Sequence, residues 1–226
     1  MSQELGKIEK PTTEEFKSSR KLFYVPLIFS PREPQVELLD KVTRYWQQVE
    51  EHLANLEAKL GNARIIFHEL VPVGGEIALK TIQELSEDSF QIIKSRVDNG
   101  AKLEPLEDRE LLAEFMDWSR CLGLGLQSHK AFTVVYEAYT KAQEARNEFI
   151  SKKINETIQK EDIAILLMRE GHKIHFPEDI ELFYIAPPGL DEIKRWVREQ
   201  EAEFEKQMAE AAKNTEADTA EPEDGN

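Results

Sequence analysis

Four ionisable side chains stand after predicted strands, where the sequence could support chemistry. His68 and Glu69 follow a predicted strand, and His172 and His175 lie in a turn after another. Open α/β sheets bind ligands at the carboxyl ends of their strands. Imidazole and carboxylate groups there can act as general bases or hold zinc, manganese or iron. The chain could therefore carry one divalent metal ion, with Glu69, His172 and His175 as candidate ligands.

Each of these residues also has a plainer interpretation. His68 could hydrogen-bond locally at its strand end while Glu69 faces water. The turn around His172 could be solvated, with one imidazole capping a backbone carbonyl. Arg146 lies on a long predicted helix, from which it could point into a cleft or into solvent. His68, Glu69 and Arg146 are thus candidate catalytic residues, each with a structural alternative.

Other motifs narrow the chemistry. Gly74-Gly75-Glu76 begins a predicted helix, where free backbone amides could hold an anion, although the glycines could simply form a turn. The sequence contains neither GxGxxG nor a GxxxxGKS or GxxxxGKT motif, so nothing indicates a nucleotide site. The single cysteine, Cys121, lies on an apolar helix face and cannot build a disulfide framework or a thiolate metal site.

Hydrophobic periodicity predicts the elements that position these residues. Continuous apolar runs predict buried strands over 21–29, 64–67, 163–168 and 180–185, with a short strand at 101–103. Apolar residues at three- and four-residue steps predict helices over 35–60, 76–85, 88–97, 105–122, 128–158 and from 190 onward. Pro26 removes a ladder donor, so the first strand is expected at an edge of the sheet or with a bulge.

Strands and helices alternate at both ends of the chain, around a helical block at about 76–158. This order predicts a three-layer α/β fold, with a mostly parallel sheet, flanking helices and a helical insertion in the middle. We expect a flexible arm at 1–19, a single α/β domain at 20–205 and an acidic tail at 206–226. The tail has few bulky apolar residues and is expected to be disordered.

The charge balance limits the partners. The 226 residues include 44 acidic and 29 basic ones, and the net charge of -15 disfavours nucleic acid and anionic membrane surfaces. No apolar run approaches the roughly 20 residues that cross a bilayer. The absence of a signal-like N-terminal segment and the single cysteine fit a cytoplasmic protein. A homo-oligomer or a protein partner could form through the long amphipathic helices.

The C-terminal half carries a recognisable order of motifs. Arg146-Asn147 lies on a long helix, Lys153-Ile154-Asn155 lies near its end, and a strand over 163–168 and then His172 follow. This order resembles the TraB/Tiki-like superfamily, which includes erythromycin-esterase-like and haem-uptake-type proteins. The likeness is greatest to an uncharacterised prokaryotic branch with a segment similar to FHELVPVGGE. The resemblance implies metal-dependent hydrolytic or peptidase-like ancestry.

The chain departs from that pattern at two places. Arg169 stands three residues before His172, where the family's Gly-x-x-His turn has glycine, and the first strand ends in Ile28-Phe29-Ser30-Pro31 without a histidine. These departures favour a non-catalytic binding or interaction protein. The alternative is a divalent-metal-dependent hydrolase with its site at the carboxyl ends of the strands. Small-molecule binding at the same place is a third hypothesis.

Overall fold

The computed structural model describes residues 18–30 and 35–218, with side chains as far as residue 210. Within that part, residues 18–29 and 49–185 form one compact unit, and residues 30, 35–48 and 186–218 form another. The region predicted as a single domain, 20–205, thus comprises the first unit and much of the second. The predicted arm at 1–19 lies almost entirely outside the described residues.

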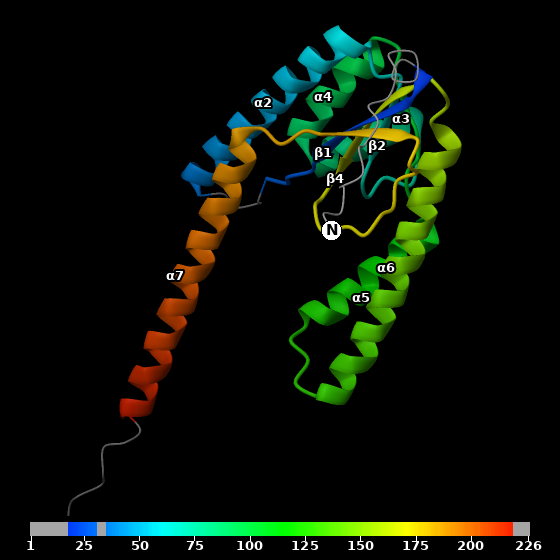
Figure 1. The fold of residues 1–226 in the computed structure, drawn as a ribbon. Coiled ribbons are helices and arrows are strands. Elements are labelled where there is room, and N and C mark those ends of the chain that lie inside the picture. The colour runs from blue at the N-terminus through cyan, green and yellow to red at the C-terminus, as the bar shows by residue number, and fades with distance from the viewer. Residues whose placement is uncertain (1–17, 31–34, 219–226) are drawn as a thin grey trace, which may run out of the picture. The chain divides into compact units, whose positions relative to one another are not determined.

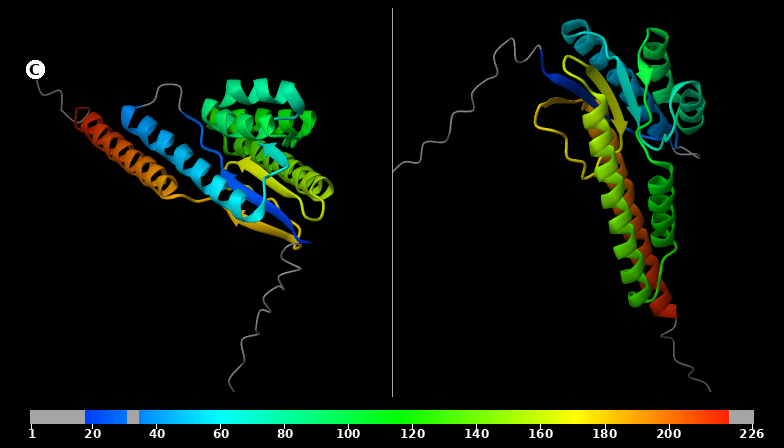
Figure 2. Two further views of the ribbon diagram at one scale, coloured as in Figure 1. Left: turned by 90° about the horizontal axis from the view of Figure 1, so that it is seen from above. Right: turned by 90° about the vertical axis from the view of Figure 1, so that its right-hand side faces the viewer.

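All five described strands belong to the first unit and form one parallel sheet (Figure 1). Their spatial order is β3-β2-β4-β1-β5. Helices cover both faces of the sheet (Figure 2), which confirms the predicted three-layer α/β fold. The strands are β1 (Arg20–Pro26), β2 (Ile65–His68), β3 (Lys102–Leu103), β4 (Ile163–Met168) and β5 (Ile180–Tyr184).

The first strand is an inner strand. β1 pairs with β4 on one side and with β5 on the other, so that Phe23 lies opposite both Ile165 and Phe183. The expected edge position was therefore wrong. Pro26 is tolerated because it is the last residue of β1. The ladder resumes directly after it, where the Leu27 amide donates to the carbonyl of Met168 at 2.9 Å.

The helices lie close to the predicted bounds, with one informative exception. α5 begins at Arg109 rather than near Pro105, because the carboxylate of Asp108 caps it by accepting from the amides of Glu110 and Leu111. Residues 104–108 are consequently a loop, and Glu107 lies buried in it. The described helices are α2 (Val36–Leu60), α3 (Gly75–Leu85), α4 (Glu87–Asp98), α5 (Arg109–Gly123), α6 (His129–Thr157) and α7 (Pro188–Asp218).

Side chains of the strands alternate between two hydrophobic layers. On one face, Leu22, Phe67 and Leu166 pack with Ile150 and Ile154 of α6 in a single buried cluster. The residues that alternate with these along each strand point to the opposite face of the sheet. That face is covered by α4 and the second half of α2 (Figure 2). Both faces of the sheet are thus buried, as the continuous apolar runs predicted.

The second unit is built from the first half of α2 and from α7. The amide of Gly189 donates to the side-chain oxygen of Gln48 at 2.8 Å, and Arg44 pairs with Glu192 at 3.0 Å. A Cβ at position 189 would lie 3.0 Å from the Cα of Tyr45, so glycine permits the close approach. α7 continues to Asp218, so the predicted disorder of residues 206–218 is not confirmed, and residues 219–226 lie outside the described chain.

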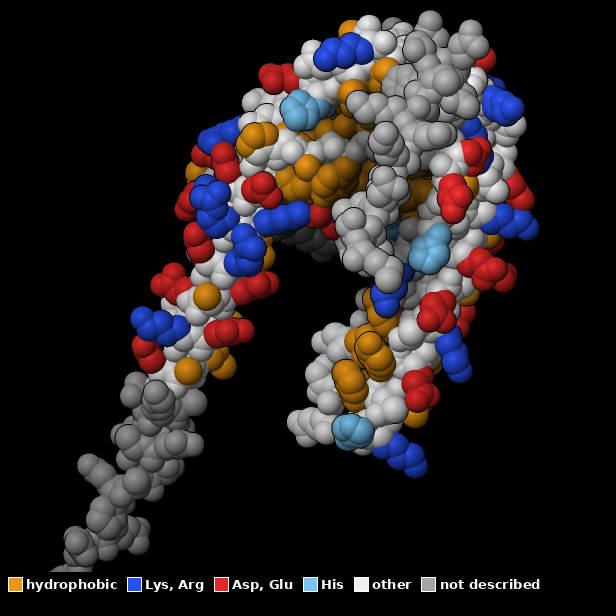
Figure 3. Space-filling model, in the orientation of Figure 1, with side chains coloured by type: hydrophobic (Ala, Val, Ile, Leu, Met, Phe, Trp, Pro, Cys, Tyr) orange, Lys and Arg blue, Asp and Glu red, His pale blue; other side chains and the backbone are white. Residues whose placement is uncertain are grey.

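The face seen in Figure 3 mixes acidic and basic side chains, and apolar side chains gather over the sheet and on the α5–α6 hairpin. Leu124, Phe132, Val134 and Tyr136 of this hairpin are all exposed, and the rings of Phe132 and Tyr136 stack. Association through amphipathic helices stays a prediction with which these residues are compatible. Within residues 18–30 and 35–218, no helix combines the length and apolar content that crossing a membrane requires.

Truncation of a central strand residue tests the layered core. Leu166 of β4 is fully buried, so Leu166→Ala should lower the free energy of unfolding by roughly 2–5 kcal/mol through lost burial and a residual cavity. Leu182→Ala on β5 is the matched control, because Leu182 is 45% exposed. Urea unfolding followed by circular dichroism would measure both. Equal losses in the two variants would contradict this account of the core.

Candidate functional site

The order of the strands creates a crevice at one edge of the sheet. β2 and β4 are neighbours, yet the chain leaves β2 toward β3 on one side and leaves β4 toward β5 on the other. Such a divergence between adjacent parallel strands is where α/β proteins bind ligands. A hollow of about 300 Å³ lies there. It is lined by Glu69, Phe115, Met116, Ser119, Tyr139, Gln143, Arg146, Asn147 and residues 168–172.

A buried ion pair forms one wall of this hollow. Arg146 on α6 donates through Nε to Glu107 Oε2 at 2.9 Å and through Nη2 to Glu107 Oε1. The same Nη2 also donates to Glu69 Oε1 at 3.1 Å. All three residues are at least 96% buried. Phe115 of α5 supports the guanidinium, whose central carbon lies 4.7 Å from the ring centre.

Arg169 extends the pair into a cluster of four charges. Its Nε and Nη2 donate to the two carboxylate oxygens of Glu69, each at 3.0 Å, and its backbone amide donates to Glu69 Oε2 at 2.9 Å. Two arginines thus balance two glutamates. The side chain of Arg169 is 45% exposed, in contrast to the other three. The cluster therefore has one solvent-facing member beside the hollow.

The backbone after β2 holds Glu69 in this position. The Glu69 amide continues the ladder by donating to the Leu167 carbonyl at 2.9 Å. Leu70 then adopts a φ of 67°, in the left-handed region that non-glycine residues rarely occupy. Its amide donates to Glu107 Oε1 at 3.0 Å. The turn thus directs the carboxylate of Glu69 toward α6 and delivers an amide to the second glutamate.

The charge state of Glu69 follows from its neighbours. Burial alone would raise the pKa of its carboxyl, but the hydrogen bonds and charge of Arg169, together with Arg146, hold that pKa below its usual value. Glu69 is therefore an ionised partner of two guanidinium groups at neutral pH. A general base or a metal ligand needs a carboxylate oxygen with a free direction of approach, and both oxygens of Glu69 are already engaged.

His172 lies on the other side of the hollow and is half-buried. Its ring meets Tyr24 and Phe176 edge-on, at 5.2 and 5.9 Å between ring centres. Burial and the nearby Arg146 lower its pKa against the opposing effect of Glu69, so the neutral ring is favoured. Nδ1 accepts from the Ile174 amide at 3.3 Å. The proton of the neutral ring therefore sits on Nε2.

Several polar atoms of the hollow have no partner within the described chain. Asn147 is 93% buried, lines the hollow, and its side-chain amide makes no hydrogen bond to another described residue. Nη1 of Arg146 and Nη1 of Arg169 likewise make none, since each guanidinium uses only Nε and Nη2. All three residues line the hollow, so these atoms are available to a ligand that enters it.

The structure separates His68 from the other candidates. His68 is buried on the opposite face of the sheet, where Nε2 lies 3.2 Å from Ser89 Oγ of α4 and Nδ1 lies 2.6 Å from the Glu69 carbonyl. Burial lowers the pKa of His68 to about 4. Alternation along β2 explains the separation, because consecutive residues of a strand point to opposite faces. His68 therefore has a structural role and cannot share a site with Arg146 and His172.

The three predicted metal ligands do not assemble. Glu69 and His172 line the same hollow, whereas His175 lines a separate one on the outer side of α6, where its carbonyl accepts from Ser151 Oγ at 2.5 Å. No group of three His, Cys, Asp or Glu side chains in the described part of the chain could hold a metal ion. Glu69, His172 and His175 thus do not form a three-ligand group in the described structure, because the two histidines line different hollows.

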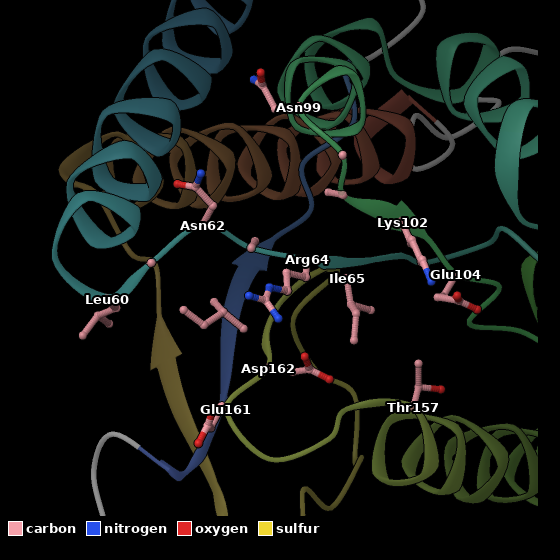
Figure 4. A pocket seen from close by; sticks show the side chains of 15 residues that line it. Leu60, Asn62, Arg64, Ile65, Asn99, Lys102, Glu104, Thr157, Glu161 and Asp162 are labelled. Atoms are coloured by element: carbon pink, nitrogen blue, oxygen red, sulfur yellow. The ribbon is translucent and has the colours of Figure 1, made fainter. Parts of the chain in front are cut away.

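A larger hollow, of about 730 Å³, lies at the opposite edge of the sheet (Figure 4). Arg64, Lys102, Glu161 and Asp162 surround it at the amino ends of the strands. Three of these side chains belong to exposed residues and Asp162 is half-buried, so none is a buried polar group aimed into a cavity. Size alone therefore does not make it the candidate site.

Sequence reasoning missed two members of the charge cluster. Glu107 was expected in the first turn of a helix, and Arg169 appeared only as the residue that interrupts a Gly-x-x-His spacing. The signal for Glu107 was Asp108, a better helix cap that moves the start of α5 and turns residue 107 into a buried loop position. The only signal for Arg169 was its position directly after β4, at the edge of the sheet where α/β proteins bind ligands.

The fold and the hollow define a three-layer parallel α/β protein with its candidate site at the carboxyl edge of the sheet. No protein-family model, no curated protein and no solved structure matches the chain. The chemistry of the hollow is therefore indicated by its geometry alone. The resemblance to the TraB/Tiki-like superfamily stays a prediction.

Titration of His68 should make stability depend on pH. The folded ring has a pKa of about 4, whereas an unfolded one titrates near ~6.5. Between these two pKa values the ring is protonated mainly in the unfolded chain. The contribution of neutral His68 to the free energy of unfolding is therefore fully present above about pH 7 and falls as the pH drops. The expected loss between pH 7 and pH 5 is about 2 kcal/mol.

Chemical unfolding at several pH values would measure this slope. His68→Asn should flatten it, whereas His175→Asn should not, because residue 175 is exposed. An unchanged slope in His68→Asn would show that another group causes the dependence.

Removal of one charge tests the buried cluster. Glu107→Gln keeps the shape of the side chain but leaves the buried Arg146 with a neutral partner, and should cost roughly 3–5 kcal/mol of unfolding free energy. Asp117→Asn, which breaks the exposed Arg120–Asp117 pair on α5, should change little. Thermal and urea unfolding would compare the two. A small loss in Glu107→Gln would mean that the cluster is not structurally important.

Proposed function

We propose that the protein is a non-catalytic binding protein that holds a small molecule in the hollow between the carboxyl ends of β2 and β4. One observation supports this most directly. The carboxylates of Glu69 and Glu107 are bound by arginines, while the side-chain amide of Asn147 and one nitrogen of each arginine have no partner in the described chain. The hollow thus offers groups that can recognise a ligand, whereas Glu69 and Glu107 are bound to arginines and are not arranged as an acid or a base.

The alternative, a metal-dependent hydrolase, has less support from the same residues. A histidine that acts as a general base is usually oriented by an acceptor on its second nitrogen, such as a carboxylate. Nδ1 of His172 instead accepts a hydrogen bond from the Ile174 amide. Glu69 has both oxygens bound to arginines, so neither residue is arranged as an activated base or as part of a three-ligand metal site.

The suggested relation to the TraB/Tiki-like superfamily also belongs to this proposal. The residues on which the resemblance depends, Arg146, Asn147 and His172, line one hollow although they come from different elements. Their convergence supports a shared architecture of the site. The end of β1 supplies no histidine to it, which supports a member that binds without catalysing.

Asn147→Leu is the sharpest test of this function. Leucine has the same number and branching of side-chain heavy atoms as asparagine, and Asn147 makes no hydrogen bond to the described chain, so the variant should fold and lose binding. Protein-observed NMR with a library of acidic, basic and neutral fragments would detect ligands. We expect bound fragments to shift resonances of residues 115–119, 139–147 and 168–172 in the native protein and not in Asn147→Leu.

Asn62→Leu is the matched control, because Asn62 is exposed and lines the hollow at the amino ends of the strands. It should retain all binding. If no fragment binds, or if the shifts map to residues 61–65 and 99–104, the proposed site is wrong.

The hydrolase alternative is tested on the same protein. Hydrolysis of ester and peptide substrates should be absent with zinc or manganese added. Activity that requires metal and disappears in Glu69→Gln would overturn the non-catalytic interpretation.

A further inference from the structure

The unengaged atoms of the hollow are mostly hydrogen-bond donors. Nη1 of Arg146 and Nη1 of Arg169 can only donate. Nε2 of His172 carries the proton of the neutral ring, because Nδ1 accepts from the Ile174 amide. The hydroxyl of Tyr139 accepts from Gln143 at 3.3 Å and keeps its own proton to give. A molecule that satisfies these groups must be rich in acceptors.

The acids of the hollow do not cancel this preference. Glu69 is bound by both arginines, and Glu170 is exposed and accepts from the hydroxyl of Tyr184. The amide of Asn147 and the side chains of Ser119 and Gln143 are neutral acceptors that a ligand donor could use. The charged donors that a ligand can meet on the polar side of the hollow are therefore Nη1 of Arg146 and Nη1 of Arg169.

The other side of the hollow is apolar. Phe115 and Met116 face it from α5, and Met168 forms part of it at the end of β4. A volume of about 300 Å³ is at the lower end of the range for ligand pockets. It suits a small molecule with one acceptor-rich end and one apolar body, rather than a nucleotide or a bare inorganic anion.

We propose that the ligand is a small carboxylate with an apolar body. Its carboxylate lies against Arg146, Arg169 and Asn147, and its apolar part lies against Phe115 and Met116. This inference rests on the proposed function and adds the chemical class of the ligand. Planar guanidinium groups match a carboxylate geometrically, and the charge-assisted hydrogen bonds that result are among the strongest in proteins.

Local donors, rather than the overall field, must supply the affinity. The chain has a net charge of -15, which repels anions at long range. The charges of the two arginines are already balanced by two glutamates. A bound carboxylate would therefore be stabilised mainly by hydrogen bonds in a partly buried place, and less by attraction to a net positive charge. Binding should therefore depend on the charged end of the ligand and on Asn147, and only weakly on ionic strength, because contacts at this depth are poorly screened.

Phenylacetate and its neutral analogue phenylacetamide provide the test. Both have the same apolar body, and only the first has a carboxylate. We would titrate each into the full-length protein at pH 7.5 and at two sodium chloride concentrations, and follow the resonances of residues 139–147 and 168–172. The expected result is saturable binding of phenylacetate at least tenfold tighter than that of phenylacetamide, and loss of this preference in Asn147→Leu but not in Asn62→Leu.

The outcomes separate the ligand class from the function itself. Equal affinities, or tighter binding of phenylacetamide, would overturn the carboxylate proposal while leaving a small-molecule site in place. Shifts that Asn147→Leu does not reduce would mean that the anion binds elsewhere on the surface, which also overturns it. Failure of both compounds, together with failure of every fragment in the library, would overturn the proposed function as well.

Discussion

The pairing of two buried glutamates with the buried Arg146 and the partly exposed Arg169 is the constraint on which the rest of the first unit depends. Glu69 comes from the end of β2, Glu107 from the loop before α5, Arg146 from the middle of α6 and Arg169 from the end of β4. A buried charge without its partner costs several kcal/mol. The four segments must therefore meet in one arrangement, and the helical insertion cannot leave the sheet without exposing unpaired charge.

The same cluster decides what the hollow can do. Guanidinium groups need more than one acceptor, and the glutamates satisfy only Nε and Nη2 of each arginine. The two glutamates are thereby less available for proton transfer or metal binding, and one nitrogen of each arginine is left without a partner in the described chain. The proposal of recognition rather than catalysis depends on the way in which these charges are paired.

Sequence reasoning predicted the layers better than the site. The apolar runs identified β4 to the residue, because a strand buried on both faces has no ambiguous boundary. The position of Pro26 was misleading, since a proline at the last residue of a strand removes no bond that the sheet needs. His68 and His175 were misplaced for a similar reason. Residues that are close in sequence can point to opposite faces of a strand or to opposite sides of a turn. Hydrophobic periodicity does not show on which of these sides the other residues of a site lie.

The connection between β4 and β5 has a consequence for the local opening of the edge strand β5. Most parallel strands are joined through a helix, but residues 169–179 cross over β1 without one. Arg169 and His172 belong to this loop, and the same loop reaches the edge strand β5 through Glu170 and Tyr184. An occupant of the hollow would therefore slow the local opening of β5. Hydrogen exchange along that strand becomes a reporter of occupancy at a site that the strand itself does not touch.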